Sequence, residues 1–242
     1  MNNTIQTIPV FNLCLSFIPV VFVVVFMHRW SLVSLTAVYA TLRMVIQLVL
    51  IGYVLTYIFR TELSAIVIAV LAVMLVASSW IALRPVKQRS RQMYLYIFTS
   101  ITLGGVTTLA LITQVVLELN PWYLPQYMIP LAGMIFANAM NTVSLAAERF
   151  ESETKNGIAY EQARSTAFNA ALIPLINMLF AVGLVSLPGM MTGQILSGVS
   201  PLIAVRYQIM VMCMVFGSGG ISAACYLYLI KHSSERAVGN VI

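Results

Sequence analysis

The chain has 242 residues, of which 60% are hydrophobic and only 8% are charged, and its mean hydropathy is +0.93. Soluble domains carry about 25% charged residues, so this chain lacks the charge to cover a water-facing surface. Composition therefore excludes a soluble globular protein and predicts an all-α, polytopic membrane bundle whose main solvent is the lipid bilayer. The net charge of +6 is spread over the predicted loops, which argues against a nucleic-acid partner.

Seven apolar runs approach the ~20 residues that a helix needs to cross a bilayer. They are expected to form one transmembrane domain over residues 1–242, with spans at about 8–27, 38–59, 63–82, 93–116, 127–146, 167–187 and 203–230. The first run reads as a retained helix, because no Lys or Arg precedes it and no small-residue cleavage site follows it. Residues 31–37 are expected to be an interfacial stretch.

The basic residues predict the orientation of these spans. Ten of them fall on one predicted side: Arg29, Arg84, Lys87, Arg89, Arg91, Arg149, Lys155, Arg164, Lys231 and Arg236. The opposite side holds Arg60 and at most Arg206 besides. Because Lys and Arg are concentrated in cytoplasmic loops, the N-terminus is predicted to lie outside and the C-terminus in the cytoplasm.

A charged island lies between the fifth and sixth runs, in a predicted cytoplasmic loop at about 147–166. It holds four of the chain's seven acidic residues and three basic ones: Glu148, Arg149, Glu151, Glu153, Lys155, Glu161 and Arg164. A charged segment in so apolar a chain must lie in water. We expect it to contact a soluble partner, and a merely solvated loop is the alternative.

No motif of an enzyme is present. The chain has no G-x-x-x-x-G-K-[ST] loop and no H-E-x-x-H, and its three cysteines lie far apart in apolar runs. We therefore predict neither catalytic residues nor a cofactor in this chain, and the identity of any metal ligand stays open. The energy for any work must come from another subunit or from an ion gradient.

Arg43 and Gln47 form the sharpest polar pair inside a predicted span. They are four residues apart and share one helix face. An arginine inside a membrane helix costs roughly 2.5–3.5 kcal/mol on insertion scales, so it usually faces a bundle interior or a cavity. The alternative is that Arg43 extends to the headgroups. Gln47 is too short to do so, which favours a face turned toward protein or a pore.

Two later spans carry amides. Asn138, Asn141 and Thr142 share a face of the run at 127–146, while Asn169 and Asn177 lie near one face of the run at 167–187. Such amides often hydrogen-bond between membrane helices as structural contacts. The functional alternative is a polar path formed with the face of Arg43.

Methionine is frequent, with 14 residues. Met210, Met212, Cys213 and Met214 cluster in the last run, and Met190 and Met191 adjoin a predicted helix break at Pro188. Thioethers suit soft ions such as Cu(I), but methionine also fills gaps in apolar cores, so both interpretations stay open. The G-x-x-x-G spacing of Gly189 and Gly193 also fits a close helix contact, but Pro188 favours a helix break as the interpretation of this segment.

Three segments resemble the FetB-type ABC transporter permeases, a family that includes plant aluminium-tolerance permeases. Residues 43–55 read RMVIQLVLIGYVL, and residues 130–140 read PLAGMIFANAM. Residues 183–198 read GLVSLPGMMTGQILSG and are followed by PLIAVRYQ at 201–208. The resemblance runs from about residue 35 to 230, and its last segment is the most specific.

The resemblance implies the permease half of an ABC exporter in the cell (inner) membrane, present as a homodimer and powered by ATP on a separate cytoplasmic ATPase. Iron is the implied cargo, and a sugar nucleotide is the alternative. The candidate substrate pathway comprises Arg43, Gln47, Asn138, Asn141, Asn177, Met190, Met191, Tyr207 and Gln208. The candidate ATPase contacts are Glu148, Arg149, Glu161 and Arg164.

The chain departs from the family pattern in two places. Asn177 and Phe180 stand where that pattern has an Asp and a Lys, so the cargo can differ. The charged island is shorter than in the family, and its Leu-Gly-Ala-Thr-Pro segment is replaced by residues 157–164. This second departure concerns the segment that is expected to dock the ATPase.

Two other functions compete with an ABC permease. A gradient-driven carrier or channel would ordinarily need an Asp, Glu or His inside a span, and the predicted helix interiors have none. A membrane-embedded assembly or regulatory factor would show no transport in vesicles.

Overall fold

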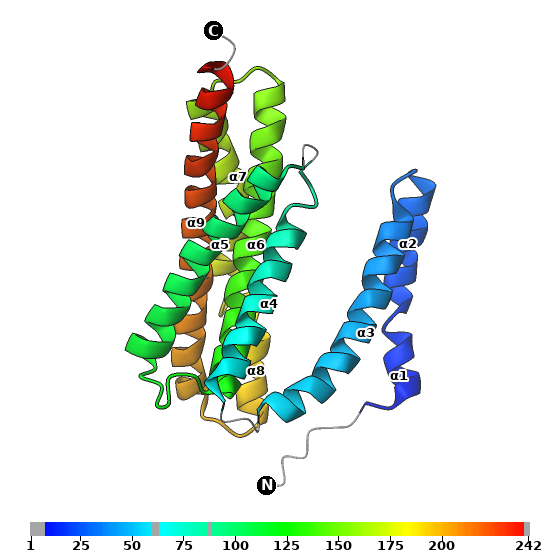
Figure 1. Ribbon diagram of the computed structural model, residues 1–242. Coiled ribbons are helices and arrows are strands. Elements are labelled where there is room, and N and C mark those ends of the chain that lie inside the picture. Colours follow the sequence, from blue (N-terminus) through cyan, green and yellow to red (C-terminus); the bar gives the residue numbers. More distant parts are fainter. Residues whose placement is uncertain (1–7, 60–62, 87–88, 240–242) are drawn as a thin grey trace. The chain divides into compact units, whose positions relative to one another are not determined.

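The structure is a computed structural model that describes residues 8–59, 63–86 and 89–239, with side chains described up to Lys231. Arg60 and Lys87, which entered the orientation argument, lie outside the described residues. The chain divides into two compact units, residues 1–61 and 62–242, which are drawn in Figure 1 and described here one at a time. The single transmembrane domain over 1–242 stays a prediction.

Unit 1 contains α1 (Val10–Leu15), α2 (Ile18–Arg29) and α3 (Ser34–Ile58). The first predicted span is thus broken at residues 16–17, because Pro19 cannot donate a backbone hydrogen bond to the preceding turn. Helix α3 begins at Ser34, inside the stretch at 31–37 that was expected to be interfacial, and the interfacial position stays a prediction. No described residue of α1 or α2 is buried, so these apolar helices need lipid or protein around them.

Unit 2 contains the remaining helices: α4 (Ser64–Ala82), α5 (Arg91–Ala110), the π-helix η1 (Leu111–Val116), α6 (Pro125–Lys155), α7 (Tyr160–Ala181), α8 (Gly189–Leu196) and α9 (Pro201–Gly239). Helix α6 contacts α4, α5, α7 and α9, and α5 also packs along α9 (Figure 1). The buried side chains of α6 recur every three or four residues, as at Ala132, Ile135, Ala139 and Val143. This spacing places one continuous stripe of α6 in the core of unit 2.

Small residues let these helices approach closely. A methyl group added to Gly104 on α5 would lie 2.2 Å from Ser222 Oγ and 2.7 Å from the Ser222 backbone nitrogen on α9. In contrast, methyl groups on Gly189 or Gly193 would meet nothing within 4 Å. The close approaches that membrane helices gain from small residues therefore occur on α5 and α9, and not at the G-x-x-x-G spacing.

The prediction of an all-α membrane bundle is confirmed. Among the described residues, six segments are long and apolar enough to cross a membrane: Val10–Arg29, Ser34–Ile58, Ser64–Ala82, Arg91–Val116, Pro125–Lys155 and Pro201–Lys231. The predicted span at 167–187 corresponds to α7, which begins seven residues earlier and ends at Ala181. Because its first turns carry Glu161 and Arg164, α7 is a helix of mixed polarity and does not join those six.

Candidate functional site

A cavity of about 520 Å³ lies at the end of unit 2 where α8 packs against α9 and where α6 begins. Its lining comes from the segment after η1, from the first three turns of α6, from α8 and from the first three turns of α9. The lining residues are Leu117, Gln126, Tyr127, Pro130, Leu131, Met134, Met190, Gln194, Val199, Tyr207 and Met210. We call this space the α6–α8–α9 cavity.

The break between α7 and α9 builds this cavity. Helix α7 ends at Ala181, a tight turn follows, and Pro188 caps the short helix α8. The predicted helix break at Pro188 is therefore present, and it turns α8 so that Met190 and Gln194, one turn apart, both line the cavity. Irregular backbone at membrane depth is tolerated where it is buried in protein or lines a cavity.

The cavity is lined by soft and neutral atoms that can bind a ligand or an ion. Three thioethers line it, from Met134, Met190 and Met210, together with the phenol of Tyr207 and the amide of Gln194. The side-chain oxygen of Gln194 is buried and has no hydrogen-bond partner in the described part of the chain. An unpaired buried carbonyl costs about 1–3 kcal/mol, so this oxygen is a group that a ligand or water would stabilise.

The structure brings only part of the predicted pathway to this cavity. Met190 and Tyr207 line it, whereas the lining includes neither Met191 nor Gln208. Gln208 is instead buried in unit 2, with 5% of the residue exposed, and its side-chain oxygen has no partner among the described groups. The methionine cluster also divides: Met210 lines the cavity, while Met212 and Met214 are buried in the core.

The amides of α6 bond within their own helix. The Asn138 side chain donates to the Met134 carbonyl at 2.8 Å, and the Thr142 hydroxyl donates to the Asn138 carbonyl at 2.8 Å. Neither of these two bonds joins two helices, which differs from the contact between helices that we expected. Asn141 on α6 and Asn169 and Asn177 on α7 are exposed.

Arg43 and Gln47 are both exposed on α3, one turn apart. They belong to unit 1, and the cavity belongs to unit 2. Their predicted role in a path shared with α6 and α7 therefore stays a prediction.

The charged island forms a helical hairpin, and its position on the cytoplasmic side stays a prediction. Helix α6 continues to Lys155, nine residues past its predicted end, and α7 begins at Tyr160. Gly157, with φ of +78°, ends α6: its amide donates to the Thr154 carbonyl at 3.1 Å, and the Ile158 amide donates to the Glu153 carbonyl at 3.2 Å. This bonding is a Schellman cap, which satisfies the last carbonyls of the helix. We call 147–166 the α6–α7 hairpin.

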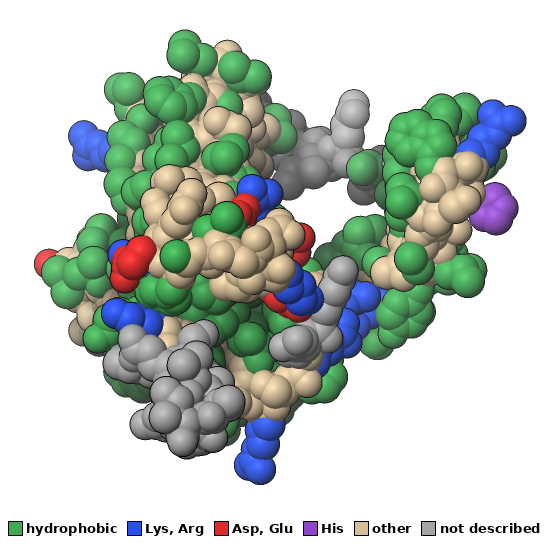
Figure 2. Space-filling view, turned by 90° about the horizontal axis from the view of Figure 1, so that it is seen from above, with side chains coloured by type: hydrophobic (Ala, Val, Ile, Leu, Met, Phe, Trp, Pro, Cys, Tyr) green, Lys and Arg blue, Asp and Glu red, His purple; other side chains and the backbone are tan. Residues whose placement is uncertain are grey.

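Ion pairs within single helices run along the hairpin. Arg149 pairs with Glu153 at 2.5 Å and Arg164 with Glu161 at 2.5 Å, and Lys155 pairs with Glu151. Pairs of this spacing stabilise a helix by about 0.2–0.5 kcal/mol each. Acidic and basic side chains intermix on this face of unit 2 (Figure 2).

Of the four predicted ATPase contacts, Glu148, Arg149 and Glu161 are exposed and Arg164 is half-buried. Glu148 also lines a shallow pocket of about 190 Å³ with Pro85, which follows α4. The α4–α5 connection therefore lies at the same end of unit 2 as the hairpin.

Sequence reasoning missed the role of Tyr160. Its hydroxyl donates to the Leu227 carbonyl on α9 at 2.6 Å, and its ring lies 5.8 Å from the ring of Phe150 on α6. The Arg164 guanidinium and the Lys231 ammonium lie 5.6 Å and 5.7 Å from the ring centre. Tyr160 thus connects the start of α7 to α6 and to α9. An aromatic residue at the start of a helix that carries charged residues in its first turns was the available signal in the sequence.

The chain matches the Uncharacterised protein family (UPF0014) over residues 10–159 and again over residues 155–234. The two matches meet at the α6–α7 hairpin, where the chain was expected to depart from its relatives. No solved structure matches the chain.

Three curated proteins illustrate the similarity. A UPF0014 membrane protein of Synechocystis is 35% identical over 80% of this chain and 82% of its own length. The probable iron export permease protein FetB of Escherichia coli is 32% identical over 93% of this chain and 92% of its own length. The protein ALUMINUM SENSITIVE 3 of Arabidopsis thaliana is 31% identical over 79% and 74%. The chain is thus a multi-pass membrane protein that belongs to the UPF0014 family, which includes the FetB-type permeases.

Proposed function

We propose that this protein is the permease subunit of an ABC exporter in the cell (inner) membrane. Two copies would form the pathway, and ATP hydrolysis would occur on a separate cytoplasmic ATPase. One observation carries the proposal: α6 is a single helix of 31 residues that has the charged hairpin at one end and Gln126, Pro130 and Met134 of the cavity at the other. At 1.5 Å per residue it extends roughly 46 Å.

This continuity supports a mechanical link between the two ends. A partner that moves the hairpin displaces α6 and α7 together, because the turn between them spans only residues 156–159 and the Tyr160 ring on α7 packs against Phe150 on α6. Pro130 leaves the Gln126 carbonyl without its usual helical donor, so α6 is more easily bent next to the cavity. ATP-driven closure of the ATPase pair would then change access to the cavity by rocking of helices.

The partner is tested by co-purification with an ABC ATPase, and the first candidate to try is a neighbouring gene product that has a phosphate-binding loop. We expect the double variant Glu148→Lys, Glu161→Lys to lose the complex, because it reverses two exposed charges of the hairpin. Glu118→Lys is the control. It reverses one exposed charge after η1, outside the hairpin, and is expected to retain the complex. If the hairpin variant still co-purifies with the ATPase, the proposed contact is wrong.

Iron is the first candidate cargo, and it is supported by the similarity to FetB. The three cavity thioethers favour a soft ion such as Cu(I) as the second candidate. Inverted vesicles that contain the permease and its ATPase should take up iron when ATP is supplied. Uptake of Cu(I) in preference to iron would select the second cargo.

Two further outcomes would overturn metal export by an ABC permease. If neither metal enters, an organic cargo such as a sugar nucleotide replaces it. If an imposed ion gradient drives uptake without ATP or the ATPase, the protein is a gradient-driven carrier.

A further inference from the structure

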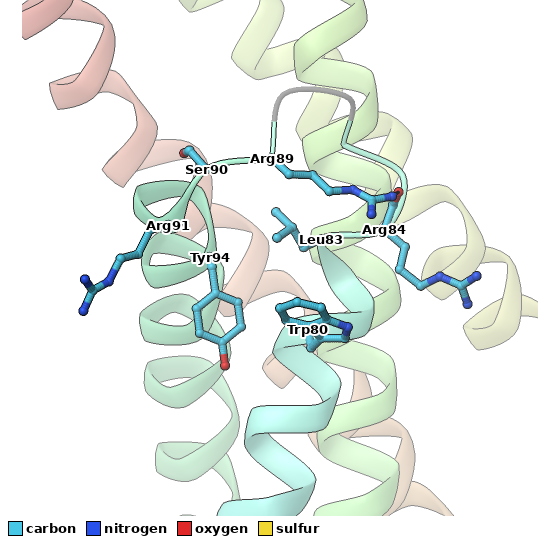
Figure 3. Close-up of a pocket in the computed structure, with 7 residues that line it drawn as sticks. All are labelled: Trp80, Leu83, Arg84, Arg89, Ser90, Arg91 and Tyr94. Carbon is cyan, nitrogen blue, oxygen red and sulfur yellow. Dashed lines mark hydrogen bonds between the residues drawn. The ribbon is translucent and has the colours of Figure 1, made fainter.

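A second pocket, of about 340 Å³, lies between the end of α4 and the start of α5 (Figure 3). Three arginines line it, Arg84, Arg89 and Arg91, above an apolar part formed by Trp80, Leu83 and Tyr94. The pocket is at the hairpin end of unit 2 and takes no part in the α6–α8–α9 cavity. We call it the arginine pocket.

The positive charge of this pocket is not neutralised within the described chain. The ion pairs among the described residues all lie in the α6–α7 hairpin, and none includes Arg84, Arg89 or Arg91. In Figure 3 the Arg89 side chain extends across the pocket, whereas the Arg84 and Arg91 side chains point away from it on opposite sides. The three cationic residues together give this end of unit 2 a positive field that attracts an anion, with the Arg89 guanidinium over the pocket. Arginine also binds the oxygens of a phosphate through two donors at once, which favours a phosphate as that anion.

Arg89 is held in place before any ligand arrives. Its Nη2 donates to the Arg84 carbonyl at 2.7 Å and its Nε donates to the Val86 carbonyl at 3.3 Å. These bonds use neutral acceptors and leave the charge intact. In Figure 3 the Arg89 side chain crosses the top of the pocket toward Arg84. The Arg89 side chain is therefore already ordered in the folded protein, and an anion that binds there loses little free energy to immobilising it.

The start of α5 adds to the field. Ser90 is the N-cap of this 20-residue helix, and its hydroxyl accepts the Met93 amide at 3.0 Å. The remaining amides of the first turn lie at the positive end of the helix dipole, beside the pocket.

The apolar part of the pocket distinguishes between possible phosphates. Trp80 is 66% exposed although it is a large aromatic residue, and its ring lies 6.3 Å from the ring of Tyr94, edge to face. Trp and Tyr are enriched where a membrane meets water, with rings at the level of the lipid headgroups. Basic groups directly above aromatic groups match a lipid that has its phosphate above its acyl chains, whereas a free phosphate would use only the arginines.

We propose that the arginine pocket binds an anionic phospholipid, with the phosphate beside the Arg89 guanidinium, in the positive field of Arg84 and Arg91, and the first acyl carbons against Trp80 and Tyr94. Basic pockets between membrane helices bind lipid headgroups by this chemistry. The site is separate from the cavity and from the hairpin, and it rests on neither the cargo nor the ATPase.

Trp80 itself provides the test. In the full-length protein with Trp30→Phe and Trp122→Phe, the remaining tryptophan is in the pocket. We would reconstitute this protein in phosphatidylcholine bilayers and measure quenching of its fluorescence by brominated phosphatidylglycerol and by brominated phosphatidylcholine. The expected result is a preference for phosphatidylglycerol that falls about five-fold in Arg89→Gln, since one arginine near a lipid surface contributes about that factor.

Three variants separate charge from folding. Arg89→Lys keeps the charge and should keep most of the preference, and the triple change of Arg84, Arg89 and Arg91 to Gln should abolish it. Arg29→Gln removes one exposed charge at the end of α2 and should leave the preference unchanged.

Three results would overturn the proposal. Equal quenching by the two brominated lipids would show that the pocket has no anionic preference. Displacement of brominated phosphatidylglycerol by inorganic phosphate would show that it takes a soluble phosphate. If Arg89→Gln retained the lipid preference but lost co-purification with the ATPase, the pocket would be a protein contact.

Discussion

Gly157 determines where α6 ends. Its φ of +78° lies in the left-handed region, where a side chain collides with the following carbonyl, and the two cap bonds depend on this geometry. A methyl group at this position would meet nothing within 4 Å, so space does not limit substitution there. Only the backbone conformation limits substitution at Gly157, so a change there tests the helix cap without a steric clash.

We predict that Gly157→Ala destabilises the cap by about 1–2 kcal/mol, because alanine pays that cost in the left-handed region. Amide hydrogen exchange at residues 153–160 should then accelerate by about five-fold or more in detergent. Gly157→Asn is the matched control, since asparagine adopts this conformation with less strain, and its exchange should stay closer to that of the parent. Equal exchange rates for the alanine variant and the parent would show that the cap does not hold the turn.

At the scale of elements, the contact of α5 with α9 depends on the missing side chain of Gly104. A methyl group there would meet both the hydroxyl and the backbone of Ser222, and the backbone cannot move away as a flexible side chain would. A methyl group added to Gly217 on α9 would meet nothing within 4 Å. The two glycines therefore differ in packing.

Gly104→Ala is expected to destabilise unit 2 by about 1–3 kcal/mol, the usual cost of overpacking a filled interface. Thermal unfolding of the purified protein in detergent would measure the loss. Gly217→Ala should unfold near the temperature of the parent or slightly above it, because alanine is the better helix former. Similar unfolding temperatures for both variants would contradict the close α5–α9 contact.

At the scale of the whole molecule, the orientation in the membrane follows from the distribution of Lys and Arg. Within unit 2, the arginine pocket and the α6–α7 hairpin lie at one end, as Pro85 and Glu148 share a pocket there. The α6–α8–α9 cavity is built from the other ends of α6 and α9. The positive-inside rule predicts that the hairpin is cytoplasmic and that the cavity lies toward the outer side.

We predict that Asn156→Cys, in the hairpin turn, is labelled by a membrane-impermeant maleimide only after the cells are opened. Asn120→Cys, before α6, should be labelled in intact cells. Both residues are exposed, and Cys14, Cys213 and Cys225 would first be replaced by alanine to remove the native thiols. The reverse labelling pattern would invert the assignment of both ends.

The sequence by itself determined the membrane class, the helical fold and the approximate positions of the long helices, because a span must be apolar over about 20 residues to cross the bilayer. It also indicated the helix break at Pro188 and two residues of the cavity, Met190 and Tyr207. It did not indicate the short helix α8 or the division of the first span into α1 and α2. The match of local pattern to structure was closest at α4, predicted at 63–82 and found at Ser64–Ala82.

Only the tertiary structure decided which polar residues share a site. Met134 and Gln126 on α6 line one cavity with Gln194 on α8, while the Asn138 side chain donates to the Met134 carbonyl of its own helix, and periodicity cannot distinguish these cases. The charged island looked like a loop because its composition is that of solvent-exposed chain. It is helical because i,i+4 ion pairs, a glycine cap and the bond of Tyr160 to α9 stabilise both helix ends, and that last contact spans 67 residues of sequence.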